Sequence, residues 1–373
     1  MPAKVQNYLS LLREKRGLGA ADLARRIGVT RQTVYAIEAG SYVPNTLVAL
    51  KLAQALEVNV EDLFRLEDNP APAAHTAGIE LLPGGQEPQP GQPVRLCRVD
   101  RHTIGTLPEP LAWYLPPADG VLVETGGVGK TRRARLFEDA GDSGKRLLVA
   151  GCDPGISVLA RHLQKAGVEL VIAHRNSSQA LELLRGGWIH AAGSHLRDQA
   201  SGESNLPAVR KLFPKRSAAV ISFAVWEEGL VVARGNPKGI RGVADLAETQ
   251  SRMMNREPGA GSRLLFDSEL ERLSIPAGKI GGYERIAQGH LAAAWQVSIG
   301  NADCCVATRA AARVFGLDFL PLLTERYDLV IRRPHLDLPG MQILLDTLSR
   351  ASFRRELEGL GGYDVRNAGE QRA

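Results

Sequence analysis

The chain has 373 residues, 44% hydrophobic and 23% charged, which is the composition of an ordinary globular protein and is long enough for two or three domains. No apolar run is long enough to span a bilayer, and the N-terminal stretch MPAKVQNYLSLLREKRG is interrupted by charge, so neither a membrane segment nor a signal peptide is expected. The net charge of +5 permits a nucleic-acid partner without requiring one, so the local distribution of charge must decide.

Residues 1–66 carry the pattern of a small helical domain. Gly28 suits the left-handed end of one helix, and Thr30 is a good N-cap for the next. Two helices joined by a tight three-residue turn form the helix-turn-helix pattern of DNA-binding proteins. The region holds nine Lys/Arg against six Asp/Glu, an excess of three that is compatible with phosphate binding. The helices that apolar periodicity predicts cover residues 4–16, 20–27, 31–39, 45–56 and 60–65.

The stretch LLREKRGLGAADLARRIGVTRQTVYAIEAGSYVPNTLVALKLAQALEVNVEDLF resembles the Cro/XRE family of helix-turn-helix regulators along its whole length. The resemblance implies that the helix beginning at Arg31 enters the major groove, where Arg and Gln match guanine and adenine edges. The family usually has Ser-Gln where this chain has Gly19-Ala20, so a phosphate contact is expected to be missing and dimerisation to matter more. A protein-interaction domain without DNA binding is the alternative. The expected DNA-binding residues are Thr30, Arg31, Gln32, Thr33, Tyr35, Asn45 and Thr46.

Residues 67–93 hold six prolines and four glycines in 27 positions, which predicts a semi-extended linker. Residues 94–145 follow, where VRLCRV and DGVLVE favour strands and LPEPLAWYLPPA favours a proline-rich connection. This segment is expected to be a small β-rich subdomain or an arm that packs against the rest of the chain.

The run VLVETGGVGKT, residues 121–131, resembles the end of a phosphate-binding loop. The P-loop pattern needs glycine five residues before Gly129, and that position is Glu124, whose carboxylate would repel phosphate. We therefore keep a nucleotide-binding enzyme only as a remote alternative and expect a connecting loop here. Gly259-Ala260-Gly261 begins like a dinucleotide fingerprint, but the third glycine position is Leu264.

The four cysteines show no CxxC spacing, and no paired Cys/His spacing is present, so reduced cytoplasmic thiols and no metal site are expected. No GxSxG motif or other pattern requires covalent catalysis, and we expect neither an enzyme nor a cofactor. Cys152 borders a glycine-containing turn, whereas Cys304 and Cys305 are typical of a buried strand. The cysteines are Cys97, Cys152, Cys304 and Cys305.

From Arg146 to residue 366 strands and helices alternate, which predicts an α/β domain with parallel strands. RLLVAG, VELVIAHR, WIHAAGSHL and DCCVA are the predicted strands, with amphipathic helices between them. Several strand-to-helix turns are rich in Gly, Ser, Asn and His, and helix N-termini that converge on a cleft can hold a small anion. Ligands of open α/β sheets lie at the carboxyl ends of strands, where these turns fall.

This half of the chain resembles the type 2 periplasmic-binding-protein fold, which LysR-type effector domains share. The motifs that carry the resemblance are GGWIHAAGSHL, EEGLVVARGNPKGIRGVADL, NREPGAGSRLLFD, GGYERIAQGHLAAA and LDFLPLLTERYDLVI. It implies two lobes, a cleft that closes on a ligand, and hinge crossings near Phe223–Glu228 and Glu325–Ile331. The expected ligand-binding residues are Asp153, Ser157, Asn176, Ser177, Ser178, His195, Arg256, Ser262, Arg263, Glu284, His290 and Tyr327.

The most similar subgroup of this fold occurs alone, behind helix-turn-helix domains, or fused to molybdopterin-biosynthesis proteins. That association makes molybdate or tungstate the first expected ligand, with a cofactor precursor or a small organic acid left open. The sequence therefore predicts a multidomain, cytoplasmic, one-component transcriptional regulator that binds double-stranded DNA as a homodimer or higher oligomer. A non-DNA-binding accessory or storage protein of molybdenum-cofactor assembly is the alternative.

Overall fold

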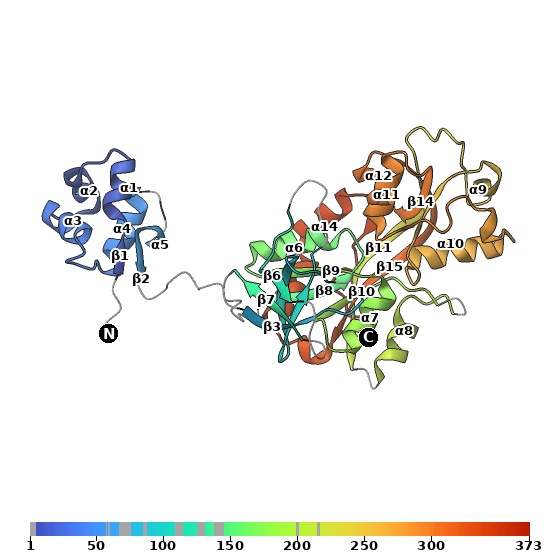
Figure 1. The fold of residues 1–373 in the computed structure, drawn as a ribbon, viewed down its shortest axis with the longest axis horizontal. Helices are drawn as coiled ribbons and strands as arrows, with labels where there is room; N and C mark the ends of the chain where they lie inside the picture. Colours follow the sequence, from blue (N-terminus) through green and yellow to red (C-terminus); the bar gives the residue numbers. More distant parts are fainter. Residues whose placement is uncertain are drawn as a thin grey trace. The chain divides into compact units, whose positions relative to one another are not determined.

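The structure is a computed structural model that describes residues 5–56, 58, 60–66, 76–84, 88–108, 115–124, 131–137, 145–198, 201–214 and 217–373. The chain divides into two compact units, Met1–His75 and Thr76–Ala373, each of which is described by itself (Figure 1). Among the described residues, no helix combines the length and the apolar character needed to cross a membrane.

The first unit is a helical domain whose apolar faces meet in one core. Leu23, Ile27, Val34, Leu52 and Leu56 are buried there. As predicted, the helix before the turn ends at a left-handed glycine (Gly28, φ 75°), and the Oγ1 of Thr30 accepts a hydrogen bond of 3.1 Å from the Thr33 amide. The helices are α1 (Leu9–Lys15), α2 (Ala20–Ile27), α3 (Arg31–Glu38), α4 (Thr46–Leu56) and α5 (Val60–Leu63).

The predicted first helix, over 4–16, is wrong at its start, because Val5–Asn7 form strand β1. This strand pairs antiparallel with β2 (Phe64–Leu66), which takes the end of the predicted fifth helix. Asn7 fastens this strand to the helical core, since its Nδ2 donates to the Ile37 carbonyl at 2.7 Å. A two-stranded ribbon thus ties the two ends of the helical domain together.

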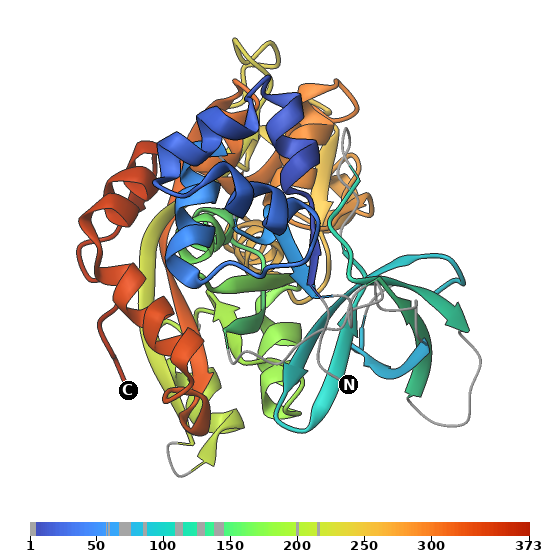
Figure 2. The same cartoon turned by 90° about the vertical axis from the view of Figure 1, so that its left-hand side faces the viewer.

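The second unit begins with a closed five-stranded barrel in the order β3-β5-β4-β6-β7 (Figure 2). Strand β3 lies inside residues 67–93, which the proline and glycine content predicted to be a linker, so that prediction is wrong over Thr76–Leu81. The strand was missed because Ile79 is its one buried side chain. A single buried residue in a short strand is a weaker sequence signal than the six prolines around it. The barrel strands are β3 (Thr76–Leu81), β4 (Pro93–Val99), β5 (His102–Thr106), β6 (Gly120–Glu124) and β7 (Thr131–Leu136).

The glycine run at 121–131 lies between two strands of this barrel. Residues 125–130 fall outside the described residues, but β6 and β7 on either side of them pair antiparallel. A phosphate-binding loop leads from a strand into a helix. Here a strand follows instead.

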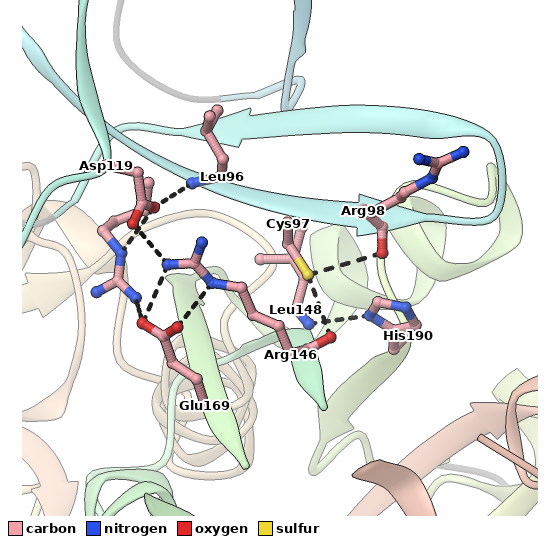
Figure 3. A network of polar contacts seen from close by, with 9 residues as sticks. Leu96, Cys97, Arg98, Asp119, Arg146, Leu148, Glu169 and His190 are labelled. Carbon is pink, nitrogen blue, oxygen red and sulfur yellow. Dashed lines mark hydrogen bonds and ion pairs between the residues drawn. The ribbon is translucent and has the colours of Figure 1, made fainter. Parts of the chain in front are cut away.

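The barrel packs directly on the α/β domain that follows it. Cys97 and Val99 of the barrel share one apolar core with Leu148 of β8 (Arg146–Gly151). At the rim of this contact, Asp119 accepts hydrogen bonds from the Leu96 amide at 2.6 Å and from Arg146 at 2.7 Å (Figure 3). Glu169 continues the network, since Arg146 Nε lies 2.9 Å from its Oε2 (Figure 3). The barrel is therefore an integral part of the second unit.

The α/β domain is built on one mixed sheet of nine strands in the order β13-β12-β14-β11-β15-β10-β8-β9, with β16 paired to β11. Strand pairs β8–β9, β8–β10, β12–β13 and β12–β14 are parallel, as the alternation of strands and helices predicted. The remaining strands are β9 (Glu169–His174), β10 (Ala191–Ser194), β11 (Ala218–Val232), β12 (Met253–Arg256), β13 (Ile286–Ala287), β14 (Cys304–Thr308), β15 (Asp318–Arg332) and β16 (Tyr363–Asp364).

Two long antiparallel strands, β11 and β15, run through both halves of this sheet (Figure 1). Strand β15 pairs with β10 on one side and β11 pairs with β14 on the other, so the two strands connect two lobes. These are the crossings expected near Phe223–Glu228 and Glu325–Ile331. The helices on the lobes are α6 (Ile156–Lys165), α7 (Ser177–Arg185), α8 (Leu206–Leu212), α9 (Asp245–Glu248), α10 (Gly261–Arg272), α11 (His290–Ser298), α12 (Arg309–Val314), α13 (Pro339–Ser349) and α14 (Ala351–Gly359), with short 3-10 turns at Ala277–Lys279 and Arg333–His335.

The domain extends beyond the predicted boundary at residue 366. Gln371 forms a β-bridge with Ile221, and Arg372 pairs with the buried carboxylate of Asp328. The C-terminal residues therefore belong to the α/β domain.

Candidate functional site

Polar side chains gather where the strands of the α/β domain end and the helices begin. Cys152 follows β8 and His195 follows β10, both in the first lobe. Arg256 ends β12, and Ser262 and His290 lie in the first turns of α10 and α11, all in the second lobe. Because the carboxyl ends of parallel strands meet at one edge of a sheet, these segments converge on the cleft between the lobes.

His195 is the centre of this group and is 2% exposed. Its Nδ1 lies 2.6 Å from Oε2 of Glu325, and its Nε2 lies 3.4 Å from the Sγ of Cys152. Its backbone amide donates to the Oγ of Ser177 at 3.0 Å. Burial alone would lower the pKa of His195, but the nearby Cys152 sulfur and the carboxylate of Glu228 outweigh it and raise this pKa. The imidazole is thus held on both ring nitrogens.

Glu228 lies beside His195 and is completely buried. The hydroxyl of Ser262 donates to its Oε1, and Arg256 Nη1 donates to that same hydroxyl oxygen at 3.3 Å. Burial first, and repulsion from Glu325 second, raise the pKa of Glu228 to about 8, and burial raises the pKa of Glu325 to about 7. The carboxyl groups of Glu228 and Glu325 come within 4.8 Å of each other and are buried, so the pair favours sharing one proton.

His290 completes the cluster from the second lobe. It is 1% exposed, and neither ring nitrogen forms a hydrogen bond with any residue that the structure describes. Its Nδ1 lies 3.7 Å from Oε1 of Glu228, and its ring packs edge-on against Trp226 with 5.3 Å between the centroids. Burial lowers the pKa of His290 well below its ordinary value, which favours the neutral ring. A buried imidazole with two unpaired nitrogens is costly unless something binds it.

The two lobes touch each other over this cluster. Asn176 Nδ2 donates to the Pro258 carbonyl at 3.2 Å, and Ser178 Oγ donates to the Gly259 carbonyl at 3.4 Å. A methyl group added to Gly261 would collide with the imidazole of His195. The structure therefore has the cleft closed, with the cluster sealed beneath these contacts.

A two-lobed α/β domain with a closing cleft is the architecture expected from the sequence. The family model of the PBP superfamily domain matches residues 160–349, just over half of the chain. The chain belongs to the PBP superfamily. A helix-turn-helix family model matches residues 9–63, so a DNA-binding type of domain precedes the PBP-superfamily domain.

Several characterised and uncharacterised proteins resemble parts of this PBP-superfamily chain. "Uncharacterized protein YvgK" of Bacillus subtilis is 31% identical over 61% of this chain and 74% of its own length. The "uncharacterized HTH-type transcriptional regulator YgzD" of the same organism is 45% identical over 17% of this chain and 97% of its own length. Among solved structures, the sulfate-binding protein SubI of Mycobacterium tuberculosis aligns with a TM-score of 0.45 at 14% identity, over 59% of this chain and 86% of that one.

The structure brings together most of the residues predicted to bind ligand in the PBP-superfamily domain. Asp153 is buried, accepts from the Tyr363 hydroxyl at 2.8 Å, and has its pKa raised to about 7 by burial. Tyr327 is fully buried, and its hydroxyl fits against Gly151 and Gly193, where any side chain would collide with it. The predicted residues that line or seal the cleft are Asp153, Asn176, Ser177, Ser178, His195, Arg256, Ser262, His290 and Tyr327.

Three predicted ligand residues lie apart from the cluster. Ser157 is exposed, and its hydroxyl donates to the Pro154 carbonyl. Arg263 pairs with Asp267, stacks 4.1 Å from the ring centroid of Tyr283 and donates from Nη1 to the Arg256 carbonyl at 3.2 Å, so its guanidinium braces α10 against the end of β12. Glu284 is exposed on a turn. These residues were predicted to bind ligand because they lie in or next to strand-to-helix turns. In the structure, Ser157 and Arg263 bond to nearby residues of their own segments, and Glu284 is exposed.

Sequence reasoning missed the acidic floor of the cleft. Glu228 and Glu325 fall in the two crossings but were not expected to be site residues, and Trp226 was not considered at all. A signal was available for Glu228, because the pair Glu227-Glu228 interrupts the apolar strand AVWEEGLVV, whereas Glu325 lies in the polar run TERYD and gives no such signal. A charged residue in such a run is unusual unless it is paired or functional.

The helix-turn-helix domain exposes the start of α3, the helix that the sequence predicts to enter the major groove. Arg31 and Gln32 are exposed, and Tyr35 is 44% exposed. Arg31 Nη2 donates to the Tyr35 hydroxyl at 2.7 Å, which holds the two side chains together on the surface. Asn45 precedes α4 and its Oδ1 accepts from the Val48 amide at 3.0 Å, so it caps this helix. Thr33 is half-buried and Thr46 is exposed.

Proposed function

We propose that the chain is a one-component transcriptional regulator, in which ligand binding to the PBP-superfamily domain controls DNA binding by the helix-turn-helix domain. The observation that carries the proposal is the pairing, in one chain, of an exposed recognition helix with a two-lobed domain whose cleft holds unsatisfied buried polar groups. The PBP-superfamily domain needs no catalytic role or resident cofactor in this proposal, and a DNA-binding protein of this kind acts in the cytoplasm.

We infer that the ligand is a small oxyanion, with molybdate and tungstate as the first candidates. Helices α7, α10 and α11 begin at the cleft, and α10 and α11 have no side-chain cap among the described residues. Uncapped helix starts leave amide N–H groups free for an anion. Ser177 adds a hydroxyl. The buried guanidinium of Arg256, paired with Glu257 through Nε and Nη2, directs its Nη1 at the Ser262 hydroxyl. The metal identity of the oxyanion rests on the resemblance to domains fused to molybdopterin-biosynthesis proteins.

Ligand binding would act on DNA affinity through lobe closure. A ligand shifts a conformational equilibrium only by its difference in affinity for the two states, and DNA and ligand must then affect each other's binding equally. One helix-turn-helix domain makes a small DNA interface, so two copies on a two-fold symmetric site are expected. Val43, Leu47 and Leu50 support this, because they leave an apolar surface on the helical domain that a second copy could cover.

Fluorescence anisotropy tests the proposal with the full chain, a labelled duplex of the DNA upstream of its own gene, and a scrambled duplex of equal length. We expect tighter binding to the upstream duplex and a change in affinity on adding molybdate or tungstate, with sulfate and phosphate as controls. A melting-temperature scan with the same anions measures binding independently of DNA. Stabilisation by oxyanions without DNA binding at low salt would support the accessory or storage protein instead.

A further inference from the structure

The cleft contains a group of side chains that an oxyanion does not require. Cys152, His195 and His290 place one sulfur and two ring nitrogens within 4.8 Å of one another, and all three side chains are buried. Their neighbours Glu228 and Glu325 are acidic. An anion is held by N–H groups, hydroxyls and positive charge, so a thiol and two carboxyls at the same place need another explanation.

One of the three donor pairs already has the spacing of two ligands on one metal ion, and the other two pairs lie within 4.8 Å. A tetrahedral Zn²⁺ with Zn–S of about 2.3 Å and Zn–N of about 2.0–2.1 Å holds its ligand atoms roughly 3.3–3.8 Å apart. Cys152 Sγ and His195 Nε2 lie 3.4 Å apart. A ring nitrogen of His290 lies within 4.8 Å of both atoms, and neither nitrogen of this ring has a hydrogen-bond partner among the described residues. Its unpaired nitrogens are the independent sign that a partner belongs here.

The surroundings also fit, because each histidine has a carboxylate behind it. His195 uses Nδ1 to bond Oε2 of Glu325, which leaves Nε2 directed at Cys152. His290 has Glu228 3.7 Å from its Nδ1. Histidines that bind metals regularly donate their other ring N–H to a carboxylate, which fixes the ring and its tautomer. His195 and Glu325 show this pattern directly. Glu228 lies close enough to His290 to accept its Nδ1–H in the same way after a small shift.

We propose that Cys152, His195 and His290 bind a late transition-metal dication of the Zn²⁺ type, with Glu325 and Glu228 as positioning residues. One thiolate and two imidazoles form a borderline-soft set that suits Zn²⁺ or Co²⁺ and disfavours Mg²⁺ and Ca²⁺, which take oxygen ligands. Three protein ligands leave the fourth position open.

The site lies across the two lobes. Cys152 and His195 belong to the first lobe, and His290 begins α11 in the second. The ligand set is therefore complete only when the cleft is closed, and metal binding stabilises the closed state. A bound dication would also offset the negative charge of the Cys152 thiolate and of the Glu228 and Glu325 pair, so the open position would repel an anion less. This last consequence rests on the proposed function, whereas metal binding itself does not.

Co²⁺ tests the site, because a thiolate–Co²⁺ bond produces an intense near-ultraviolet charge-transfer band and a tetrahedral site produces strong visible bands. The full chain, first treated with a chelator and then freed of it, is titrated with Co²⁺ without DNA. We expect one Co²⁺ per chain with both sets of bands, and displacement by Zn²⁺ but not by Mg²⁺. Cys152→Ser should remove the charge-transfer band, and His290→Gln should weaken Co²⁺ binding at least about tenfold.

Cys304→Ser is the matched control, since Cys304 is a buried cysteine in β14 that contacts Met253 instead of the cluster. It should keep the full spectrum. Circular dichroism checks that each variant folds. If Cys152→Ser does not fold, His290→Gln still tests the site. The proposal is overturned if Co²⁺ gives no charge-transfer band, or if the folded variants bind it as the parent chain does. Because no DNA is present, this outcome is separate from failure of the regulator proposal.

Discussion

His195 Nδ1 and Glu325 Oε2 lie 2.6 Å apart in the cleft, with side chains that are 0% and 6% exposed. His195 follows β10, whereas Glu325 lies on β15, opposite Trp226 of β11 in the antiparallel register. The contact thus joins a loop of the first lobe to the strands that connect both lobes. A buried imidazole that loses its partner is left with an unsatisfied group in a dry site.

Glu325→Ala should therefore lower the free energy of unfolding by about 3 kcal/mol, because it removes one partner of a buried pair. Glu325→Gln keeps an oxygen that can accept from Nδ1 and should cost only about 1 kcal/mol. Urea unfolding monitored by circular dichroism measures both. Glu284→Ala, an exposed acid in the same domain, is the control and should stay within about 0.5 kcal/mol. Equal losses for the Ala and Gln variants would contradict the role of this hydrogen bond.

Local sequence signals predicted the helix-turn-helix well. Gly28 and Thr30 define the turn by backbone conformation and capping, which depend on single residues. The strand pairing of Val5–Asn7 with Phe64–Leu66 could not be predicted in this way, because three-residue strands are fixed only by their partner. The barrel was missed over 76–81 for the same reason, since closure depends on pairing with β5 and β7.

The cleft was predictable only in part. Ser177, Ser262 and His290 stand at helix starts, where turn composition gives a local signal. Glu228 and Glu325 reach the site through the register of β11 and β15, a relation between segments about a hundred residues apart that spacing along the chain does not encode. The sequence predicted no metal site, because it contains no paired Cys/His spacing. The three ligands proposed above come from separate segments, and such a site leaves no spacing pattern along the chain.

Gly261→Ala should open the cleft. The added methyl group would collide with His195 across the lobe boundary, and separation of the lobes relieves the collision. Trp226 is 1% exposed and packs edge-on against both His195 and His290, so opening should shift tryptophan emission to longer wavelength. Gly242→Ala, where a methyl group meets open space in the same lobe, should leave the emission unchanged.

If the lobes do not separate in Gly261→Ala, the overpacking should instead lower the free energy of unfolding by about 1–3 kcal/mol with unchanged emission. That result would contradict a cleft that opens and closes. Fluorescence and urea unfolding on the same samples distinguish the two outcomes.

Gln32→Ala should weaken specific DNA binding and leave non-specific binding unchanged. Gln32 is exposed at the start of α3, where its amide can pair with an adenine edge, and losing one such contact costs about 1–3 kcal/mol of discrimination. Anisotropy on the upstream and scrambled duplexes measures the two affinities. Gln54→Ala removes an equally exposed glutamine from α4 and is the control. Parallel losses on both duplexes would show that Gln32 does not read bases.

If two copies pair through the apolar surface of the helical domain, as proposed, Leu47→Glu should shift the chain towards monomer. Leu47 is 62% exposed beside a groove of about 280 Å³ lined by Val43, Leu50 and Phe64, and a buried charge in a dimer interface is unfavourable. Analytical ultracentrifugation over a concentration series measures the dissociation constant, which should rise at least tenfold, or about 1.4 kcal/mol. Leu11→Glu changes a leucine that is 52% exposed on α1 and should have no effect. A similar shift by both variants would exclude a defined apolar interface.

Acid should destabilise the α/β domain through His174. Burial first, and the positive charge of Arg256 second, lower the pKa of this half-buried side chain from 6.5 to about 4, and its Nε2 has no hydrogen-bond partner among the described residues. Above pH 6.5 both the folded and the unfolded chain carry a neutral imidazole, so this group does not change stability there. Between pH 6.5 and about 4 only the unfolded chain takes up the proton, so the free energy of unfolding falls by about 2–3 kcal/mol as the pH drops. His174→Gln removes the titrating group, and urea unfolding at several pH values should then show a correspondingly smaller decrease. An equal decrease in the parent chain and the variant would assign the acid sensitivity to other groups.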